Sequence, residues 1–476
     1  MDQLIIEEQS YYLDSTPIFA QFLDMQQAVY LDSAAPFSTR GRYDIISAEP
    51  LTTLQIFSNS ALNTGNYKDG IAYLNAVKQA VKELTPSLNN SYQLPFIGGA
   101  LGYLGYDFGR QLEQLPSIAA DDLPMPQASM GIYSWAIIID HQMQRSLLVA
   151  HPQTSKDLLN NVRYRLRNAD QTIAKTANDS DRDNTPFKLR SAFEPTISRN
   201  QYNAAFSKIQ NYLHAGDCYQ VNLTQRFSAH CEGDPWQAYL TLRETAAAPY
   251  SGYLQLEQGR ILSLSPERLL QINQNTVSSS PIKGTIARGQ DAASDRQLAQ
   301  QLTNSAKDRA ENLMIVDLIR NDLGKSCIAG SIHVDQLFEL QSFETVHHLV
   351  STISGQLRDN TDAFDVLADC FPGGSITGAP KKRAMEIIEE LEPQRRSVYC
   401  GSLVYISSDG QMDSNIAIRT MIHENNRIHC SAGGGIVTDS LCDSEYQECL
   451  TKVGPLLAAL DSNGSTEVVE SAEKLR

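Results

Sequence analysis

The chain has 476 residues, of which 42% are hydrophobic and 20% are charged, a composition typical of a soluble globular protein with two domains or one large composite domain. Its formal net charge of −16 argues against binding to nucleic acid or to an anionic membrane surface, because both attract basic patches. The sequence has no long apolar run, no signal segment at its acidic N-terminus and no Cys-x-x-Cys pair among its eight cysteines, so we expect a cytoplasmic protein with reduced thiols.

The first part of the chain, residues 1–175, is rich in short apolar runs, and residues 131–141 (GIYSWAIIIDH) predict a β-strand. Residues 176–196 are polar and lack periodicity, so we interpret them as a linker between an N-terminal subdomain and a second subdomain over residues 197–460. The remaining residues, 461–476, are polar and are expected to form a tail.

A helix is predicted directly after the linker. Ser198 suits its N-cap, Gly216 suits its end, and apolar residues recur at helical spacing between them at Phe206, Ile209 and Leu213. Residues 219–227 (YQVNLTQRF) then alternate apolar with polar side chains, which predicts a half-buried strand with a polar face. Because strands occur in runs and helices occur in runs, the pattern favours the α+β class over alternating βαβ units.

The stretch SSSPIKGT, residues 278–285, places Lys283 against a glycine just after a predicted strand. Lysine is usually a solvated surface residue, so a surface turn is the ordinary interpretation of this position when it is considered alone. Other motifs of the sequence are needed to show whether Lys283 has a functional role.

Two predicted helices carry acidic faces. Residues 304–324 predict a helix that is capped by Ser305 and carries Glu311, and Glu445, Glu448 and Lys452 share one face of a helix near the C-terminus. Two solvated helix faces would explain this pattern. The functional interpretation is a hydrated Mg²⁺ held by one carboxylate from each helix, because this ion usually takes one or two protein carboxylates.

Residues 372–393 (PGGSITGAPKKRAMEIIEELEP) place a glycine-rich turn before a predicted helix. Lys381, Lys382 and Arg383 then lie at the positive end of the helix dipole, where cations are mildly unfavourable. A turn that exposes backbone N–H groups beside lysines suits a carboxylate or phosphate ligand. The alternative is a plain surface helix that follows a glycine loop.

Several long motifs between about residues 196 and 456 together resemble those of the chorismate-utilising enzymes: LSPERLL, PIKGT, DRAENLMIVDLIRND, HHLVST, FPGGSITGAPK, IAIRT and SAGGGIV followed by DSEYQE. The resemblance implies an α+β fold of two antiparallel β-sheets packed as a β-sandwich, with helices on the outside and the site at its edge. It also implies that residues 197–460 form a catalytic subdomain that binds chorismate and uses Mg²⁺.

Two positions distinguish the members of this family. Isochorismate and salicylate synthases carry a lysine that activates water where this chain has Gln220, and anthranilate synthases carry alanine where this chain has Lys283. The resemblance therefore implies amination of chorismate at C4 to 4-amino-4-deoxychorismate, the precursor of para-aminobenzoate and folate. An anthranilate synthase large subunit and a non-catalytic subunit that binds chorismate or tryptophan are the alternatives.

The resemblance also implies roles for single residues. Lys283 would attack C2 of chorismate as a nucleophile, Glu267 would act as general acid and base, and His348 would lie near the leaving hydroxyl. Mg²⁺ would be held by Glu311, Glu445 and Glu448. The other residues expected to bind substrate are Gly284, Thr285, Tyr399, Arg419, Gly434, Gly435 and Lys452.

Two further ligands are expected by resemblance. Residues 31–44 and 248–253 correspond to the tryptophan pocket of the family, and Ser33, Tyr43 and Tyr250 would line it. Whether tryptophan binds is open, because the local spacing differs from that of anthranilate synthases. Ammonia is expected from a separate glutamine amidotransferase subunit, because no unassigned stretch of the chain is long enough to hold a glutaminase domain with its nucleophilic cysteine.

Overall fold

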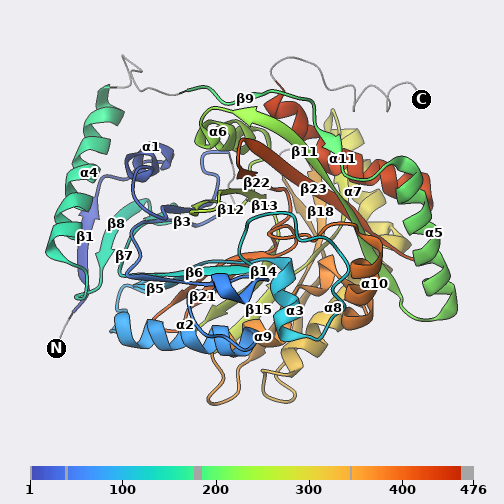
Figure 1. Cartoon of the computed structure of the whole chain (residues 1–476), viewed down its shortest axis with the longest axis horizontal. Coiled ribbons are helices and arrows are strands. Elements are labelled where there is room, and N and C mark those ends of the chain that lie inside the picture. The colour runs from blue at the N-terminus through green and yellow to red at the C-terminus, as the bar shows by residue number, and fades with distance from the viewer. Residues whose placement is uncertain (1–2, 38–40, 176–184, 344–345, 462–476) are drawn as a thin grey trace.

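A computed structural model describes residues 3–37, 41–175, 185–343 and 346–461 (Figure 1). Most of the predicted tail and residues 176–184 of the predicted linker lie outside these ranges. Within them, the strands form two sheets, and every pair of neighbouring strands is antiparallel. None of the described helices is long and apolar enough to cross a membrane.

The larger sheet has thirteen strands in the described part of the chain. Its order is β1 (Ile5–Gln9), β8 (Arg145–Ala150), β7 (Trp135–Asp140), β3 (Tyr43–Ser47), β2 (Val29–Asp32), β12 (Tyr250–Gln255), β13 (Arg260–Ser265), β22 (Thr420–Glu424), β23 (Arg427–Ile436), β11 (Gln220–Glu232) and β10 (Glu194–Pro195). Two short strands also pair with β11, namely β9 (Lys188–Leu189) and β19 (Gly378–Ala379).

The smaller sheet has ten strands among the described residues. Its order is β16 (Ile282–Ala287), β18 (Val346–Gln356), β15 (Thr276–Ser280), β14 (Arg268–Asn273), β21 (Met412–Asn415), β20 (Ser402–Ser407), β5 (Gly99–Leu104), β6 (Ala128–Tyr133) and β4 (Thr52–Ile56), and β17 (His333–Ser342) also pairs with β18. The predicted strand over residues 131–141 is in fact two strands, β6 and β7, which belong to different sheets because the chain crosses between the sheets at Ser134.

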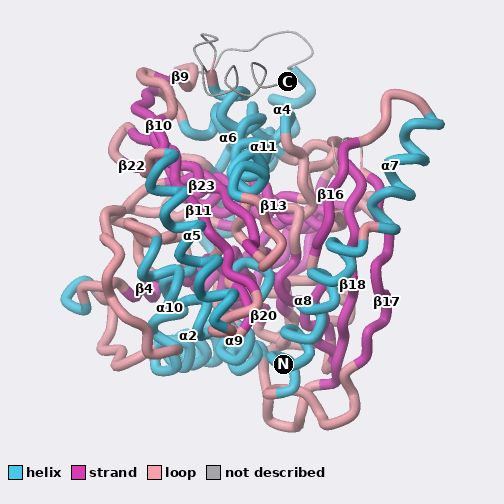
Figure 2. The backbone as a smooth tube through the Cα atoms, turned by 90° about the vertical axis from the view of Figure 1, so that its right-hand side faces the viewer, coloured by secondary structure: helices cyan, strands magenta, loops and turns pink. Residues whose placement is uncertain are grey.

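Helices cover the outer faces of both sheets, as Figure 1 shows. The larger sheet is covered by α1 (Thr16–Phe19), α4 (Lys156–Lys175), α6 (Pro235–Thr245) and α11 (Cys442–Leu460). The smaller sheet and the end of β11 are covered by α2 (Gly70–Leu84), α5 (Arg199–Ala215), α8 (Ala306–Gly324), α9 (Ala363–Cys370) and α10 (Lys381–Leu391). The other helices are α3 (Gly109–Leu112) and α7 (Ala292–Asn304), and α7 lies beside β16 (Figure 2).

Two apolar cores lie between the sheets and the helices that cover them, and a third fills the space between the two sheets. Ile45, Leu254 and Ile422 of the larger sheet pack there with Leu101 and Leu403 of the smaller sheet, together with other buried side chains of the same cluster. Two sheets packed face to face with helices outside confirm the predicted α+β sandwich. The burial of apolar side chains on both faces of each sheet explains why so many strands are apolar throughout instead of alternating.

Both sheets mix strands from the two halves of the chain. In the larger sheet, β2 pairs with β12, so that Leu31 lies opposite Gly252. In the smaller sheet, β5 pairs with β20, so that Leu101 lies opposite Tyr405. The described part of the chain is therefore a single interleaved sandwich, and the subdomain boundaries proposed from the sequence remain predictions.

The predicted helix after the linker forms as α5. Its cap residue Ser198 accepts a hydrogen bond from Gln201 N–H in a capping box, and Gly216 ends it in the left-handed region with φ of 80°. The strand that follows, β11, differs from the prediction because Gln220, Asn222 and Thr224 are buried as well as its apolar side chains. Its polar face was expected to be solvated, but α10 and β19 cover that end of the strand.

A buried ion pair joins strand β2 of the larger sheet to helix α6, which covers that sheet. The Asp32 carboxylate accepts from Arg243 Nε at 2.7 Å and from the hydroxyls of Tyr239 and Tyr30 at 2.7 and 3.0 Å. The side chains of Asp32 and Arg243 are 0% and 2% exposed. Because both side chains are buried, the Asp32 carboxylate depends on Arg243, whose guanidinium also lies 3.3 Å from the Asp14 carboxylate.

We expect Arg243→Met to lower the free energy of unfolding by about 3–5 kcal/mol, because it leaves the Asp32 carboxylate buried without its cation. Urea unfolding followed by fluorescence measures the change. Arg320→Met is the matched control, since Arg320 pairs with Asp317 on the exposed face of α8 and should have little effect. Equal losses in the two variants would show that the buried pair has no special role.

Candidate active site

Two predicted catalytic residues, Lys283 and Glu267, lie on either side of Ser375. Glu267 is in the connection that carries the chain from β13 in the larger sheet to β14 in the smaller sheet, and Lys283 is in the edge strand β16. Lys283 Nζ donates to the backbone oxygen of Ser375 at 2.9 Å, and Ser375 Oγ donates to Glu267 Oε1 at 2.9 Å. The structure therefore brings the expected nucleophile and the expected acid together.

Burial moves the pKa values of this pair toward each other. It raises the pKa of the Glu267 carboxyl, against the opposing effects of the Lys283 ammonium and the Ser375 hydroxyl. Burial also lowers the pKa of Lys283, and although Glu267 opposes this effect, the nearby Lys452 adds to it. Both shifts favour the neutral forms, an amine that can attack and an acid that can donate a proton.

The two predicted acidic helix faces meet beside Lys283. Glu311 of α8 and Glu445 of α11 both face the ammonium of Lys307, whose Nζ lies 3.9 Å from the first and 3.7 Å from the second. Glu448, one turn along α11, pairs with Lys452 at 2.6 Å. Among the described residues, no three His, Cys, Asp or Glu side chains close around a point in the manner of a metal site.

Charge and burial compete at these carboxylates. Burial raises the pKa of Glu311, while Lys283 and Lys307 lower it, and the net shift is upward. Burial also acts to raise the pKa of Glu448, but the ion pair with Lys452 outweighs it and the net pKa is lowered. The acidic faces are therefore not two solvated surfaces, because they share cations and influence the pKa of Lys283.

The glycines of β23 give the site its room. An added Cβ at Gly434 would lie 3.2 Å from a carboxylate oxygen of Glu445, and one at Gly435 would lie 2.0 Å from the side-chain amide of Gln220. In the described residues β22 pairs with β23 only as far as Cys430, so the edge of β23 at these glycines has no strand partner on the side away from β11. Lys452 Nζ donates to the backbone oxygen of Gly433 on this stretch at 3.0 Å.

Gln220 is an unsatisfied polar group in this wall. Its side chain is fully buried, and neither its amide nitrogen nor its amide oxygen has a hydrogen-bond partner among the described residues. A buried amide without partners is costly, so groups of this kind are typical of binding sites that a ligand completes.

Arg419 is a second polar group of the site, and it lacks an ion-pair partner among the described residues. Burial lowers the pKa of its guanidinium, and it forms no ion pair among the residues the structure describes. Tyr399 lies in the neighbouring turn, where Cys400 N–H donates to Ala417 O at 2.9 Å. A half-buried guanidinium without a carboxylate partner suits the carboxylate of a substrate.

His348 and the PIKGT motif form one hydrogen-bonded unit. Thr285 Oγ1 lies 2.7 Å from His348 Nδ1, and the two residues pair across β16 and β18. Gly284 between Lys283 and Thr285 has φ of 81°, where an added Cβ would lie 3.0 Å from Asp308. Only glycine adopts this conformation without strain, so it sets the direction in which the strand presents Lys283.

The basic residues at the start of α10 do not form the anion site that the sequence suggested. Lys381 pairs with Asp322 at 2.6 Å, Lys382 with Glu113 at 3.8 Å and Arg383 with Glu386 at 3.2 Å. Neighbouring carboxylates therefore offset the unfavourable placement of cations at this helix end. The contribution of the glycine-rich turn to the site is Ser375.

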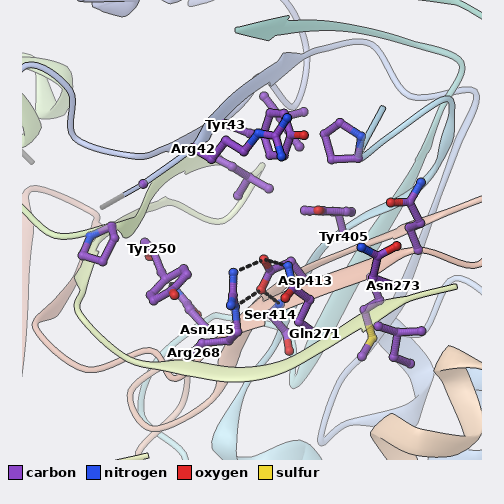
Figure 3. A pocket seen from close by; sticks show the side chains of 18 of the residues that line it. Arg42, Tyr43, Tyr250, Arg268, Gln271, Asn273, Tyr405, Asp413, Ser414 and Asn415 are labelled. Carbon is purple, nitrogen blue, oxygen red and sulfur yellow. Dashed lines mark hydrogen bonds and ion pairs between the residues drawn. The ribbon is translucent and has the colours of Figure 1, made fainter. Parts of the chain in front are cut away.

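A separate cavity of about 670 Å³ lies between the sheets on the side of the N-terminal strands. Tyr43 and Tyr250, both expected in a tryptophan pocket, line it together with Tyr405, as Figure 3 shows. Arg268 forms a bidentate pair with Asp413, both distances 2.9 Å, and its guanidinium lies 4.8 Å from the ring centre of Tyr250.

Ser33 is not among the residues that line this cavity. It is fully buried, and both its N–H and its Oγ–H donate to Asp44, at 2.7 and 2.6 Å. The neighbouring residues Asp32 and Gly41 reach the cavity instead. Ser33 therefore shapes the wall and does not present its hydroxyl to the space.

Sequence reasoning did not single out Ser375 or Lys307, although both lie inside motifs that it used. Ser375 is a small residue in a glycine-rich turn, and nothing local indicates that its hydroxyl meets a residue more than a hundred positions earlier. Lys307 is near the start of an amphipathic helix, where a solvated lysine is ordinary. Only the meeting of α8 with α11 gives it two carboxylates.

Comparisons with known proteins agree with this site. A family model described as "chorismate binding enzyme" matches residues 26–458. The chain is 46% identical to aminodeoxychorismate synthase component 1 of Escherichia coli, over 93% of this chain and 95% of that protein, and 44% identical to the protein of the same name from Salmonella typhimurium, over 93% and 95%. The solved structure of anthranilate synthase component I from Streptococcus pneumoniae superposes with a TM-score of 0.74 at 29% identity, covering 88% of this chain and 93% of that one.

The family model spans nearly all of the sandwich and includes each of the residues that meet around Ser375. The relatives match along almost their whole length, so the likeness is not confined to one motif or one sheet. The chain therefore belongs to the chorismate binding enzymes.

Proposed function

We propose that this chain aminates chorismate at C4 with ammonia to give 4-amino-4-deoxychorismate and water. The observation that carries the proposal is the position of Lys283, a partly buried amine of lowered pKa that shares Ser375 with Glu267. Relatives named aminodeoxychorismate synthase component 1, at 44–46% identity over almost the whole chain, support it.

The lysine explains how nitrogen would reach C4. The Lys283 amine attacks C2, the double bonds shift, and the C4 hydroxyl leaves as water with a proton from Glu267. Ammonia then attacks C4, the double bonds shift back, and the C2–N bond to lysine breaks as Glu267 recovers a proton from the incoming amine. The sum is chorismate plus ammonia giving the C4 amine plus water, with Lys283 and Glu267 restored.

Other residues would hold the substrate in place. The Arg419 guanidinium, which has no carboxylate partner among the described residues, would bind the pyruvyl carboxylate with the help of Tyr399 and the free edge of β23. The Thr285–His348 pair would lie on the side of the leaving hydroxyl, and Lys452 would face the substrate from α11. Gln220 in place of a lysine leaves no base there to activate water.

We expect Lys283→Ala to slow formation of the C4 amine by roughly 100-fold or more, the scale on which single catalytic groups contribute, and to shift residual amination toward C2. Mass spectrometry and chromatography of the product from chorismate and ammonium measure both effects. Lys382→Ala, at an exposed lysine of α10, is the control. Aminodeoxychorismate made at the parental rate by Lys283→Ala would rule out the covalent step, and anthranilate as the main product of the unsubstituted chain would favour the alternative function.

The acidic faces of α8 and α11 support a Mg²⁺ site held by Glu311, Glu445 and Glu448. The three side chains do not close around one point among the described residues, but Glu311 and Glu445 already share one cation, because Lys307 Nζ lies 3.9 Å from the first and 3.7 Å from the second. Bound Mg²⁺ would supply positive charge for the ring carboxylate of chorismate. Lys307 would have to release Glu311 and Glu445 for them to act as ligands.

We expect Glu448→Gln to raise the Mg²⁺ concentration needed for half-maximal turnover by about tenfold or more, because a neutral amide is a poorer ligand than a carboxylate. Titration calorimetry with Mg²⁺ and chorismate gives the same comparison without turnover. Asp443→Asn is the matched control, since this side chain lies on the exposed side of α11 and pairs with Arg199. Identical Mg²⁺ titrations of the parent and Glu448→Gln would remove Glu448 from the ligand set.

We also propose that a separate glutamine amidotransferase subunit supplies the ammonia. Glutaminases need a cysteine thiolate, and burial raises the pKa of all eight cysteine thiols in this chain. Cys400 precedes a glycine, as a glutaminase nucleophile would, but it is buried, and burial raises its pKa to about 12. The name "component 1" of the relatives supports an assembly with a second component.

The isolated chain should use ammonium salts, better at higher pH where more free ammonia is present, and should not use glutamine. Turnover of chorismate with glutamine or ammonium as the only nitrogen source tests this, and addition of a glutaminase subunit should restore the use of glutamine. Efficient use of glutamine by the isolated chain would mean that it contains its own amidotransferase site.

The cavity lined by Tyr43 and Tyr250 supports tryptophan as a second ligand. It offers the rings of four tyrosines for an indole, namely Tyr43, Tyr92, Tyr250 and Tyr405. The charged groups of Arg268 and Asp413 lie at one wall, although these two already pair with each other. All eight cysteines are free thiols in the structure, which supports a reducing compartment such as the cytoplasm.

A further inference from the structure

Ser375 contacts both groups that the proposed reaction needs. Its Oγ donates to Glu267 Oε1 at 2.9 Å, and its backbone oxygen accepts from Lys283 Nζ at 2.9 Å. The residue is 3% exposed, so neither contact competes with bulk water. A hydrogen bond to a charged group in such a place is stronger than one at the surface.

The turn that carries Ser375 is fixed from several sides. Gly374 lets the turn approach α8 so closely that an added Cβ would lie 2.4 Å from the Leu318 side chain. Asn222 N–H donates to the backbone oxygen of Thr377 at 2.9 Å, and Arg396 Nη1 donates to Ile376 O at 2.9 Å. With its backbone held in this way, the Ser375 hydroxyl has a defined position relative to β16 and to the β13–β14 connection.

The two contacts of Ser375 have different consequences for catalysis. The backbone oxygen holds Lys283 whatever side chain residue 375 carries. The hydroxyl holds the Glu267 carboxyl at Oε1, and the backbone N–H of Ile282 donates a second hydrogen bond to the same carboxyl. The side chain of residue 375 therefore supplies one of the two hydrogen bonds that restrict the rotation of this carboxyl. A general acid that is free to rotate spends less time within reach of the leaving oxygen.

We propose that Ser375 is a positioning residue for the proposed amination, whose hydroxyl holds the Glu267 carboxyl in register with Lys283. It acts through Glu267 and does not itself touch the reacting atoms. The inference rests on the proposed function, since it assigns to Ser375 the task of orienting the acid and base of that reaction.

The test compares four variants of the full chain with chorismate and saturating ammonium. Ser375→Ala and Ser375→Cys remove the hydroxyl, and the cysteine keeps nearly the same volume while being a weak donor. We expect both to lower kcat by about tenfold or more, with little change in the KM for chorismate, because the substrate-binding groups and the Lys283 contact remain. Ser375→Thr keeps the hydroxyl and should restore most of kcat.

Thr377→Ala is the matched control. It removes a buried hydroxyl from the same turn that bonds only to the backbone oxygens of Gly373 and Gly374. We expect it to lower the unfolding temperature and to leave kcat near that of the parent at a temperature where it is folded. If Ser375→Ala does not fold, the kcat of Ser375→Cys alone tests the role of the hydroxyl.

Unchanged kcat in a folded Ser375→Ala or Ser375→Cys would overturn the proposal, and so would an equal loss of kcat in Thr377→Ala, which would assign the effect to the turn as a whole. Product analysis of the parent separates this result from the proposed function. A parent that forms no C4 amine overturns the function itself, whereas a parent that forms it alongside fully active Ser375 variants overturns only the role of Ser375.

Discussion

The cost of keeping charged groups away from water governs this structure. The sandwich buries charges between and behind its sheets, and nearly every one of those described above has an opposite charge in contact, as Asp32 has Arg243 and Asp413 has Arg268. Lys283 and Glu267 obey the same constraint, but they do not bond to each other directly. Each of them forms a hydrogen bond to Ser375 instead. Its charges are therefore less firmly fixed, which is what proton exchange requires.

Where the protein leaves a buried polar group without a partner, the substrate supplies one under the proposed function. Arg419 directly precedes β22 and Gln220 begins β11, and these two strands pair with the two edges of β23. A molecule with two carboxylates and a ring fits this inventory better than a neutral metabolite would. The polar groups without a partner thus indicate the chemistry of the substrate under the proposed function.

Much of the architecture could be predicted from the sequence. The caps of α5 and the spacing of its apolar residues depend only on neighbours within four positions, so the helix was predicted with its correct ends. The sandwich followed from a family resemblance. The burial of the polar face of β11 could not be predicted, because it depends on α10 and β19, which come more than a hundred residues later.

The candidate site divides in the same way. Lys283, Glu267 and the acidic faces of α8 and α11 were predicted from motifs, and the structure brings them together. Ser375 and Lys307 were missed because their importance lies in what they meet across the fold. Lys381, Lys382 and Arg383 suggested an anion site, but carboxylates pair with all three. The partners of Lys381 and Lys382 lie on other elements, and Glu386, the partner of Arg383, lies three residues further along the same helix.

The interleaving of the sheets has a consequence for synthesis of the protein. As the chain leaves the ribosome, β2 and β5 each have a strand partner close behind them in sequence, but their second edges stay open until β12 and β20 emerge. Strand edges exposed on a nascent chain are sites of aggregation, and pairings of long sequence separation form slowly. The first half of the molecule must therefore remain soluble for most of translation without its final partners, a demand that falls on chaperones and on the pace of elongation.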